Sequence, residues 1–117
     1  MTPRDYYYGG KNIVNGKTVT RNGIRFSDSK FLKIAGKGAC KELVGKVFSY
    51  GGRDFGLHKQ QFNMSGKYYY DVYDIYSGRY CMTAYTLKEI VSKMDEVAEK
   101  MERCPSNFFT KEMSIDN

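Results

Sequence analysis

The sequence predicts an α+β fold: a small antiparallel β-sheet with an amphipathic C-terminal α-helix packed on one face. Two Asn-Gly pairs, Asn15-Gly16 and Asn22-Gly23, lie seven residues apart between short β-branched runs, as expected for tight hairpins. The run KYYYDVYDIY, residues 67–76, has strand composition. Residues 87–101 place apolar side chains at helical spacing. At 117 residues the chain is expected to form a single domain, 1–117.

Composition limits the function classes. No apolar run approaches the roughly 18 residues of a membrane span, and the N-terminus has no apolar signal region, so we expect a cytoplasmic protein without membrane contact. Residues 1–80 carry fourteen Lys and Arg against six Asp and Glu, whereas residues 81–117 carry five against seven. A basic body of this kind favours an anionic partner, although basic charge also serves solubility alone.

The first part of the chain predicts short elements. Residues 1–10 are polar and rich in tyrosine, which predicts a loose arm. The two Asn-Gly turns then predict a meander of three short strands ending near Phe26. In residues 28–45, apolar side chains recur at near-helical spacing around Gly36 and Gly38, which predicts one short helix near 28–35 and another near 38–44.

Strands follow up to residue 85. Residues 46–50 and 54–62 predict two strands joined at Gly51-Gly52, and a turn follows at 63–66. The strand over 67–76 has two faces: Tyr68, Tyr70 and Val72 lie on one, Tyr69, Asp71 and Tyr73 on the other. Ser77-Gly78 turns the chain into a partner strand over 79–85.

The C-terminal helix has a clear start and end. Thr86 to Glu89 fits the capping box S/T-x-x-E, and Cys104-Pro105 ends the helix. Its apolar stripe runs from Leu87 to Met101 and is expected to pack on the sheet. Residues 105–117 are expected to form a loose terminus.

Chemical motifs give little support for catalysis. Asp54-Phe55-Gly56, Gly36-Lys37-Gly38 and Ser27 to Lys30 resemble fragments of known motifs but lack the companion sequences that those motifs require. The three cysteines, Cys40, Cys81 and Cys104, form no CxxC pair, and His58 is the only histidine, so we expect free thiols, no metal and no cofactor. A small enzyme using a Cys–His58 pair is the weakest of three hypotheses.

Tyrosine gives the strongest indication of a binding surface. Seven of the eleven tyrosines lie in residues 66–90. A sheet backed by one helix has one face toward water, so some of these rings are expected to be exposed among basic side chains, although cross-strand packing would also explain them. The candidate binding residues are Arg53, Lys59, Lys67, Tyr68, Tyr69, Tyr70, Tyr73, Tyr76 and Arg79.

The run HKQQFNMSGKYYYDVYDIYSGRYCMTAYTLKEIVSKM resembles the hairpin-then-helix ending of small proteins encoded by bacteriophages and mobile elements. In such proteins an aromatic strand, a tight turn with glycine and a helix start of the TLKE type recur. The resemblance covers about a third of the chain. It implies stoichiometric binding, as by anti-CRISPR and other anti-defence inhibitors, in the cytoplasm of a bacterial host.

Two binding hypotheses follow. The first is a non-catalytic protein of phage or mobile-element type that inhibits a host protein handling nucleic acid, such as a CRISPR-type defence protein, through its basic, tyrosine-rich face. The second is direct binding of single-stranded nucleic acid, with the tyrosine sheet as a stacking platform. In either case, an edge strand of the Asn-Gly hairpins would allow a homodimer.

Overall fold

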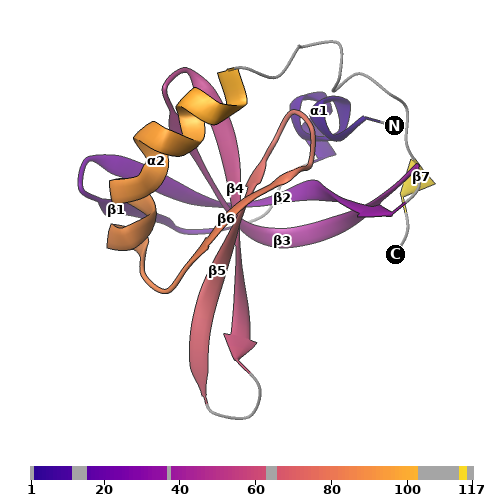
Figure 1. Ribbon diagram of the computed structural model, residues 1–117. Helices are drawn as coiled ribbons and strands as arrows, with labels where there is room; N and C mark the ends of the chain where they lie inside the picture. The colour runs from indigo at the N-terminus through magenta and orange to yellow at the C-terminus, as the bar shows by residue number, and fades with distance from the viewer. Residues whose placement is uncertain (1, 12–15, 37, 63–65, 103–113, 116–117) are drawn as a thin grey trace.

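The computed structural model describes residues 2–11, 16–36, 38–62, 66–102 and 114–115 (Figure 1). Its elements, in chain order, are α1 (Pro3–Tyr6), the π-helical turn η1 (Tyr7–Lys11), β1 (Thr18–Arg21), β2 (Ile24–Gly36), β3 (Ala39–Tyr50), β4 (Arg53–Phe62), β5 (Lys67–Asp74), β6 (Tyr80–Ala84), α2 (Leu87–Glu102) and β7 (Ser114–Ile115).

Strands β1 to β6 pair antiparallel in chain order, which makes a simple meander. The short β7 joins the same sheet by pairing in parallel with β3. The sheet is strongly curled, and α2 follows β6 (Figure 1). The α+β class with an antiparallel sheet and a C-terminal helix is therefore confirmed.

Tight glycine turns set the meander. Asn22 and Gly23 both have positive φ, 51° and 78°, as a type I′ turn between β1 and β2 requires. Gly51 and Gly52, in the turn between β3 and β4, also have positive φ, 60° and 76°. The hairpin predicted at Asn15-Gly16 lies outside the described residues, because 12–15 are not among them.

The two helices predicted over 28–35 and 38–44 are wrong, because these residues belong to β2 and β3. Gly36 and Gly38, with φ of 148° and 70°, flank the hairpin turn between these strands. Phe31 and Leu32 are adjacent, point to opposite faces of β2, and are both buried. Burial on both faces removes the period-two pattern and leaves a spacing that looks helical.

Both faces of the sheet carry core, which corrects the expectation of one open face. On the face of Phe26 (the Phe26 face), strand residues cluster with Ile90, Met94 and Val97 of α2. On the face of Phe31 (the Phe31 face), Phe31 packs with Leu43, Val47, Tyr73 and Ile75. The side chains of this second cluster are buried.

The N-terminal segment is not the loose arm that was expected of residues 1–10. Thr2 caps α1 by accepting a hydrogen bond from the Asp5 N–H at 3.0 Å. Tyr6 is buried with Leu32 and Cys40, and its hydroxyl donates to the Glu42 carboxylate. Apolar contact with the sheet therefore orders this end of the chain. At the other end, residues 114–115 form β7, whereas 105–113 and 116–117 lie outside the described residues.

Helix α2 begins where the sequence predicts. The Thr86 hydroxyl accepts from the Glu89 N–H at 3.1 Å, as in a capping box. The Glu89 carboxylate accepts from the Tyr85 N–H at 3.1 Å, one residue before the expected partner, Thr86. This hydrogen bond lowers the pKa of Glu89, and the Lys93 ammonium contributes to the same effect.

Candidate binding surface

The long hairpins β2–β3 and β4–β5 separate from one another at a fork. Strands β3 and β4 pair only from Lys46–Leu57 to Tyr50–Arg53. The residues of β3 before Lys46 pair with β2 but not with β4. The residues of β4 after Leu57 pair with β5 but not with β3. The β4–β5 hairpin consequently projects away from the rest of the sheet (Figure 1).

Glycine allows the close approach at the fork. A Cβ on Gly45 would lie 2.0 Å from the Leu57 carbonyl oxygen and 3.3 Å from the Phe31 ring. A Cβ on Gly56 would lie 2.7 Å from the same ring. Phe31 therefore sits against the backbone of two strands whose glycines leave it room, and this contact fixes the angle at which the hairpins part.

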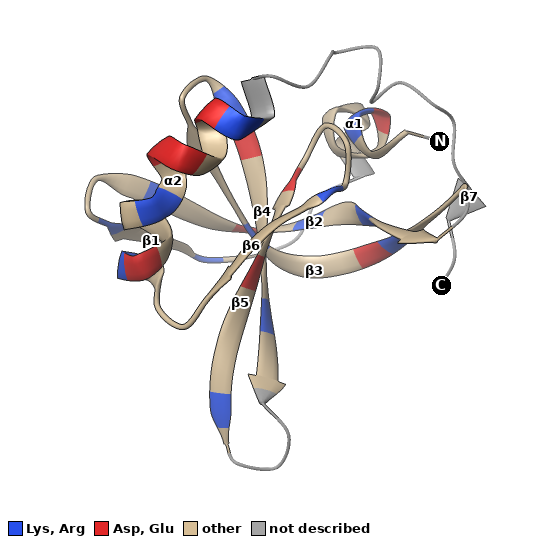
Figure 2. Cartoon of the chain, viewed as in Figure 1, with Lys and Arg blue, Asp and Glu red and all other residues tan. Residues whose placement is uncertain are grey.

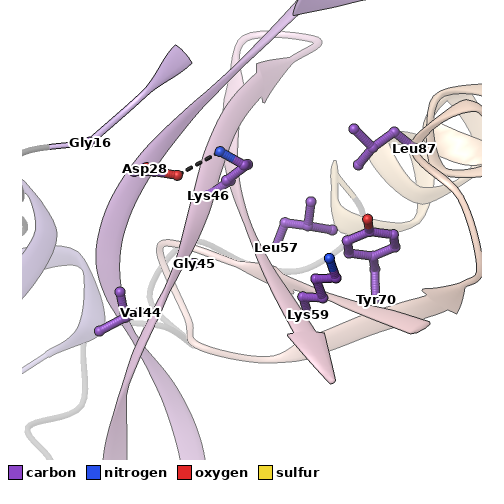
Figure 3. Close-up of a pocket in the computed structure, with 9 residues that line it drawn as sticks. All are labelled: Gly16, Asp28, Val44, Gly45, Lys46, Leu57, Lys59, Tyr70 and Leu87. Carbon is purple, nitrogen blue, oxygen red and sulfur yellow. Dashed lines mark hydrogen bonds and ion pairs between the residues drawn. The ribbon is translucent and has the colours of Figure 1, made fainter. Parts of the chain in front are cut away.

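A cavity of about 410 Å³ opens at this fork, and we call it the fork groove. Lys59 and Tyr70 lie side by side on the β4–β5 hairpin, with Val44 on the neighbouring strand β3 (Figure 3). The Lys46 ammonium pairs with the Asp28 carboxylate at 2.6 Å. That hydrogen bond, together with one from the Lys17 N–H, lowers the pKa of Asp28. The full lining is Gly16, Asp28, Val44, Gly45, Lys46, Leu57, Lys59, Tyr70 and Leu87.

An aromatic surface continues from the groove along the projecting hairpin. The Lys59 ammonium lies 4.2 Å from the centre of the Tyr68 ring, a cation–π contact. Tyr68 and Tyr85 are 48% and 62% exposed, and with Lys67 they line a second cavity of about 500 Å³. We call Lys59, Lys67, Tyr68, Tyr70 and Tyr85 the aromatic–basic face.

Charge on this hairpin has one sign toward its tip. Residues 58–62 and 67–70 include Lys59 and Lys67 and no Asp or Glu. Figure 2 shows blue segments toward the outer end of the β4–β5 hairpin, while α2 carries both signs. The aromatic–basic face therefore presents positive charge beside exposed rings.

The structure brings together four of the nine predicted binding residues: Lys59, Lys67, Tyr68 and Tyr70. Tyr69 lies on the other side of β5, opposite Gln60. Tyr73 is only 5% exposed and packs in the Phe31 cluster, where burial raises its pKa to about 12. Arg79 lies in the turn at the far end of β5, where its N–H donates to the Ser77 hydroxyl.

Arg53 and Tyr76 have structural partners instead. The Arg53 guanidinium donates to the fully buried Asp74 carboxylate through Nε at 2.7 Å and a terminal nitrogen at 3.1 Å. It also lies 5.6 Å from the centre of the Tyr76 ring, which contacts Tyr8 on another side. The Ser77 hydroxyl and N–H complete the bonds to Asp74. These groups hold the end of β5 in place.

A polar cluster lies on the Phe31 face of β4 and β5. The buried Asp71 carboxylate accepts hydrogen bonds from Gln60 and from the Thr83 hydroxyl. His58 stands directly opposite Asp71 in the sheet, and its buried Nδ1 has no hydrogen-bond partner among the described residues. Burial lowers the pKa of His58, nearby Lys33 and Lys41 lower it further, and Asp71 opposes them.

The two described thiols, Cys40 and Cys81, do not lie on the Phe31 face with His58. Cys81 packs against the Phe26-face cluster, whereas His58 follows Gly56 on the Phe31 face. Burial raises the pKa of the Cys81 thiol to about 12 and also raises that of Cys40. Both are free cysteines, as predicted, and Cys104 lies outside the described residues. A raised pKa keeps a thiol protonated and weakly nucleophilic.

Sequence reasoning missed several residues of this surface. Val44 and Lys46 are not among the predicted binding residues, because the sequence predicts a helix over 38–44 and a strand over 46–50, and the fork has no local signal. Tyr85 falls at the end of the predicted strand 79–85, yet it is the most exposed of the large apolar side chains described. Its position next to the Thr86 cap, where a strand ends, could have indicated exposure.

Among the described residues no His, Cys, Asp and Glu side chains group as metal ligands. No described helix is long and apolar enough to cross a membrane. Comparisons of the chain with protein-family models, with curated proteins and with solved structures found no match.

Proposed function

We propose that this chain is a non-catalytic binding protein that captures a protein partner through the aromatic–basic face and the fork groove. The observation that carries the proposal is the arrangement of Lys59, Tyr68 and Tyr70 beside the fork groove, on a hairpin that projects from the sheet. Tyrosine in such a position gives a large contact area at low entropic cost. In this proposal α2 packs on the Phe26 face and supports the base of the β4–β5 hairpin.

The aromatic geometry favours a protein over single-stranded nucleic acid. A stacking platform needs open ring faces for successive bases. Tyr73 is buried, Tyr76 contacts both Arg53 and Tyr8, and one face of Tyr68 is occupied by Lys59. The remaining exposed edges and hydroxyls suit the mixed polar and apolar contacts of a protein interface.

The partner in this proposal presents acidic groups, because Lys59 and Lys67 line the cavities beside the exposed rings and residues 58–62 and 67–70 include no Asp or Glu. The resemblance to phage-encoded proteins extends the proposal to a biological role: inhibition of a bacterial host protein that handles nucleic acid, by stoichiometric binding in the cytoplasm. Direct binding of single-stranded nucleic acid is the alternative that the test must separate.

The test is a tagged pull-down from bacterial lysate, with and without nuclease, using the natural chain, Lys59→Glu and Tyr68→Ala. The matched control is Arg25→Glu, which makes the same charge change at an exposed position of β2. We expect a protein partner that survives nuclease, is retained by the control and binds each face variant at least ~10-fold more weakly, which is about 1.4 kcal/mol.

Two outcomes would contradict the proposal. Equal binding by all variants would place the contact elsewhere. Loss of every partner on nuclease treatment, with binding to a deoxythymidine oligonucleotide that weakens steeply with salt, would establish the nucleic-acid alternative. Arg53 is unsuitable for this test, because reversing its charge would place a carboxylate against the buried Asp74.

A further inference from the structure

Part of β3 has an open hydrogen-bonding edge. On one side, residues 41–45 pair with residues 29–33 of β2. On the other side, β4 pairs with β3 only from Lys46 onward, and β7 pairs with β3 only at Ala39 and Cys40. Among the described residues no strand therefore covers the second edge of 41–45.

The same edge already holds an added strand. Ser114 and Ile115 lie parallel to β3 beside Ala39 and Cys40, next to the open stretch. These two residues come from a distant part of the sequence, so the edge accepts extended chain through backbone bonding. An open edge is usually protected by a bulge, proline or charge. Here Lys41 and Glu42 charge one part of the stretch, whereas Val44 is apolar and 61% exposed, so the edge beside it is accessible.

The open edge borders the fork groove. Val44 and Gly45 line the cavity from β3, and Leu57 and Lys59 line it from β4 (Figure 3). A cavity of about 410 Å³ is within the usual range for bound ligands. Lys59 supplies positive charge from β4, whereas Lys46 on the β3 side is paired with Asp28, which also lines the cavity.

We propose that residues 41–45 of β3 form a strand-addition site, which takes an extended acidic segment of the partner protein. The proposal rests on the binding function proposed above and specifies how the partner is held. Main-chain hydrogen bonds to the β3 edge would give affinity, and acidic side chains of the added strand would reach Lys59. Five paired residues correspond to about 17 Å of strand.

The probe is a synthetic peptide, acetyl-VEVEVEVE-amide, which alternates strand-forming and acidic residues. Its matched control carries N-methyl groups on alternate residues, which removes one row of N–H donors and keeps every side chain. Isotope-labelled protein is followed by amide exchange. Successive N–H groups of a strand point to opposite edges, so alternate amides within 41–45 should exchange at least ~10-fold more slowly with the peptide bound. The N-methylated peptide should bind at least ~10-fold more weakly.

A protein variant gives a second test. Val44→Glu places a carboxylate beside the acidic strand at a position whose side chain is mostly exposed, so the fold should persist, as circular dichroism would verify. We expect this variant to bind the peptide at least ~10-fold more weakly, whereas Arg25→Glu binds as the natural chain does.

The outcomes separate this inference from the proposed function. Equal binding of the two peptides, no binding of either, or protection confined to residues 58–62 of β4 would each overturn strand addition. If the partner captured from lysate depends on Lys59 yet leaves the amides of 41–45 unprotected, the binding function stands and strand addition fails. If the peptide protects 41–45 while Lys59→Glu captures every lysate partner unchanged, strand addition stands and the proposed contact face fails.

Discussion

At the scale of single residues, the basic side chains have different roles that composition does not reveal. Arg53 is bound to Asp74 inside the fold, Lys46 is paired with Asp28 at the rim of the fork groove, and Lys59 lies on an exposed ring. Only a side chain with an exposed contact region can bind a partner protein. The sequence-based set of candidates combined structural cations with available ones.

The Arg53–Asp74 pair should be a major contributor to stability. Asp74→Asn leaves the Arg53 guanidinium, which is 21% exposed, without its anionic partner. Breaking a buried pair in this way costs about 3 kcal/mol. Urea unfolding measures the loss, and Lys93→Ala, which breaks the exposed Lys93–Glu89 pair, should cost far less. Losses of similar size in the two variants would contradict the structural role of Arg53.

His58 should make stability depend on pH. Burial and the nearby Lys33 and Lys41 lower its pKa below the usual 6.5, against the opposing effect of Asp71. The unfolded chain therefore binds a proton at a higher pH than the native protein does. The contribution of neutral His58 is fully present above pH 6.5 and is lost as the pH falls through the native pKa.

Because His58 is the only histidine, its imidazole proton resonances in an NMR titration report this pKa without assignment. We expect a value below 6.5. As the pH falls below 6.5, the free energy of unfolding should also decrease more steeply in the natural chain than in His58→Gln. An imidazole that titrates at or above its usual pKa would show that His58 is more hydrated or more strongly paired with Asp71 than the structure indicates.

At the scale of elements, the turns and the helix start depend on residues that are neighbours in the sequence. The Asn22-Gly23 and Gly51-Gly52 turns require positive φ, and the Thr86 cap and apolar spacing mark α2, so these features could be predicted from sequence. Strands β2 and β3 could not, because Phe31 and Leu32 are both buried by distant segments. Tyr73 covers one from β5, and Tyr6 covers the other from α1. The fork depends on Gly45 and Gly56 fitting against Phe31, a contact with no local signal.

The candidate surface was predictable in part for the same reason. Alternation along β5 correctly separated Tyr68 and Tyr70 from Tyr69 and Tyr73. Which of the two sets would be covered depended on the curl of the sheet. That curl buries Tyr73 and leaves the outer hairpin exposed, so the surface lies at the end of β5 farthest from Tyr73.

At the scale of the whole molecule, one set of contacts closes the curled sheet. The Ile34 N–H near the end of β2 donates to the Gly78 carbonyl in the turn between β5 and β6, at 2.8 Å. A Cβ on Gly78 would lie 3.0 Å from the Leu32 carbonyl oxygen, 3.1 Å from Pro3 and 3.2 Å from the Ile34 nitrogen. This turn therefore joins α1, β2 and β5, which are far apart in the sequence.

Gly78→Ala should open this closure. Gly78 has φ of 72°, so alanine there carries the left-handed backbone cost of about 1–2 kcal/mol, and crowding against β2 and Pro3 adds to it. Gly52→Ala is the matched control, because Gly52 has φ of 76° and no atom within 4 Å of its added Cβ. We expect urea unfolding to show at least ~1 kcal/mol more loss for Gly78→Ala, with faster amide exchange at Ile34 and Tyr6 in that variant alone. Equal losses with unchanged exchange would mean that the backbone cost explains both variants and that the contact between this turn and β2 contributes little to the curl.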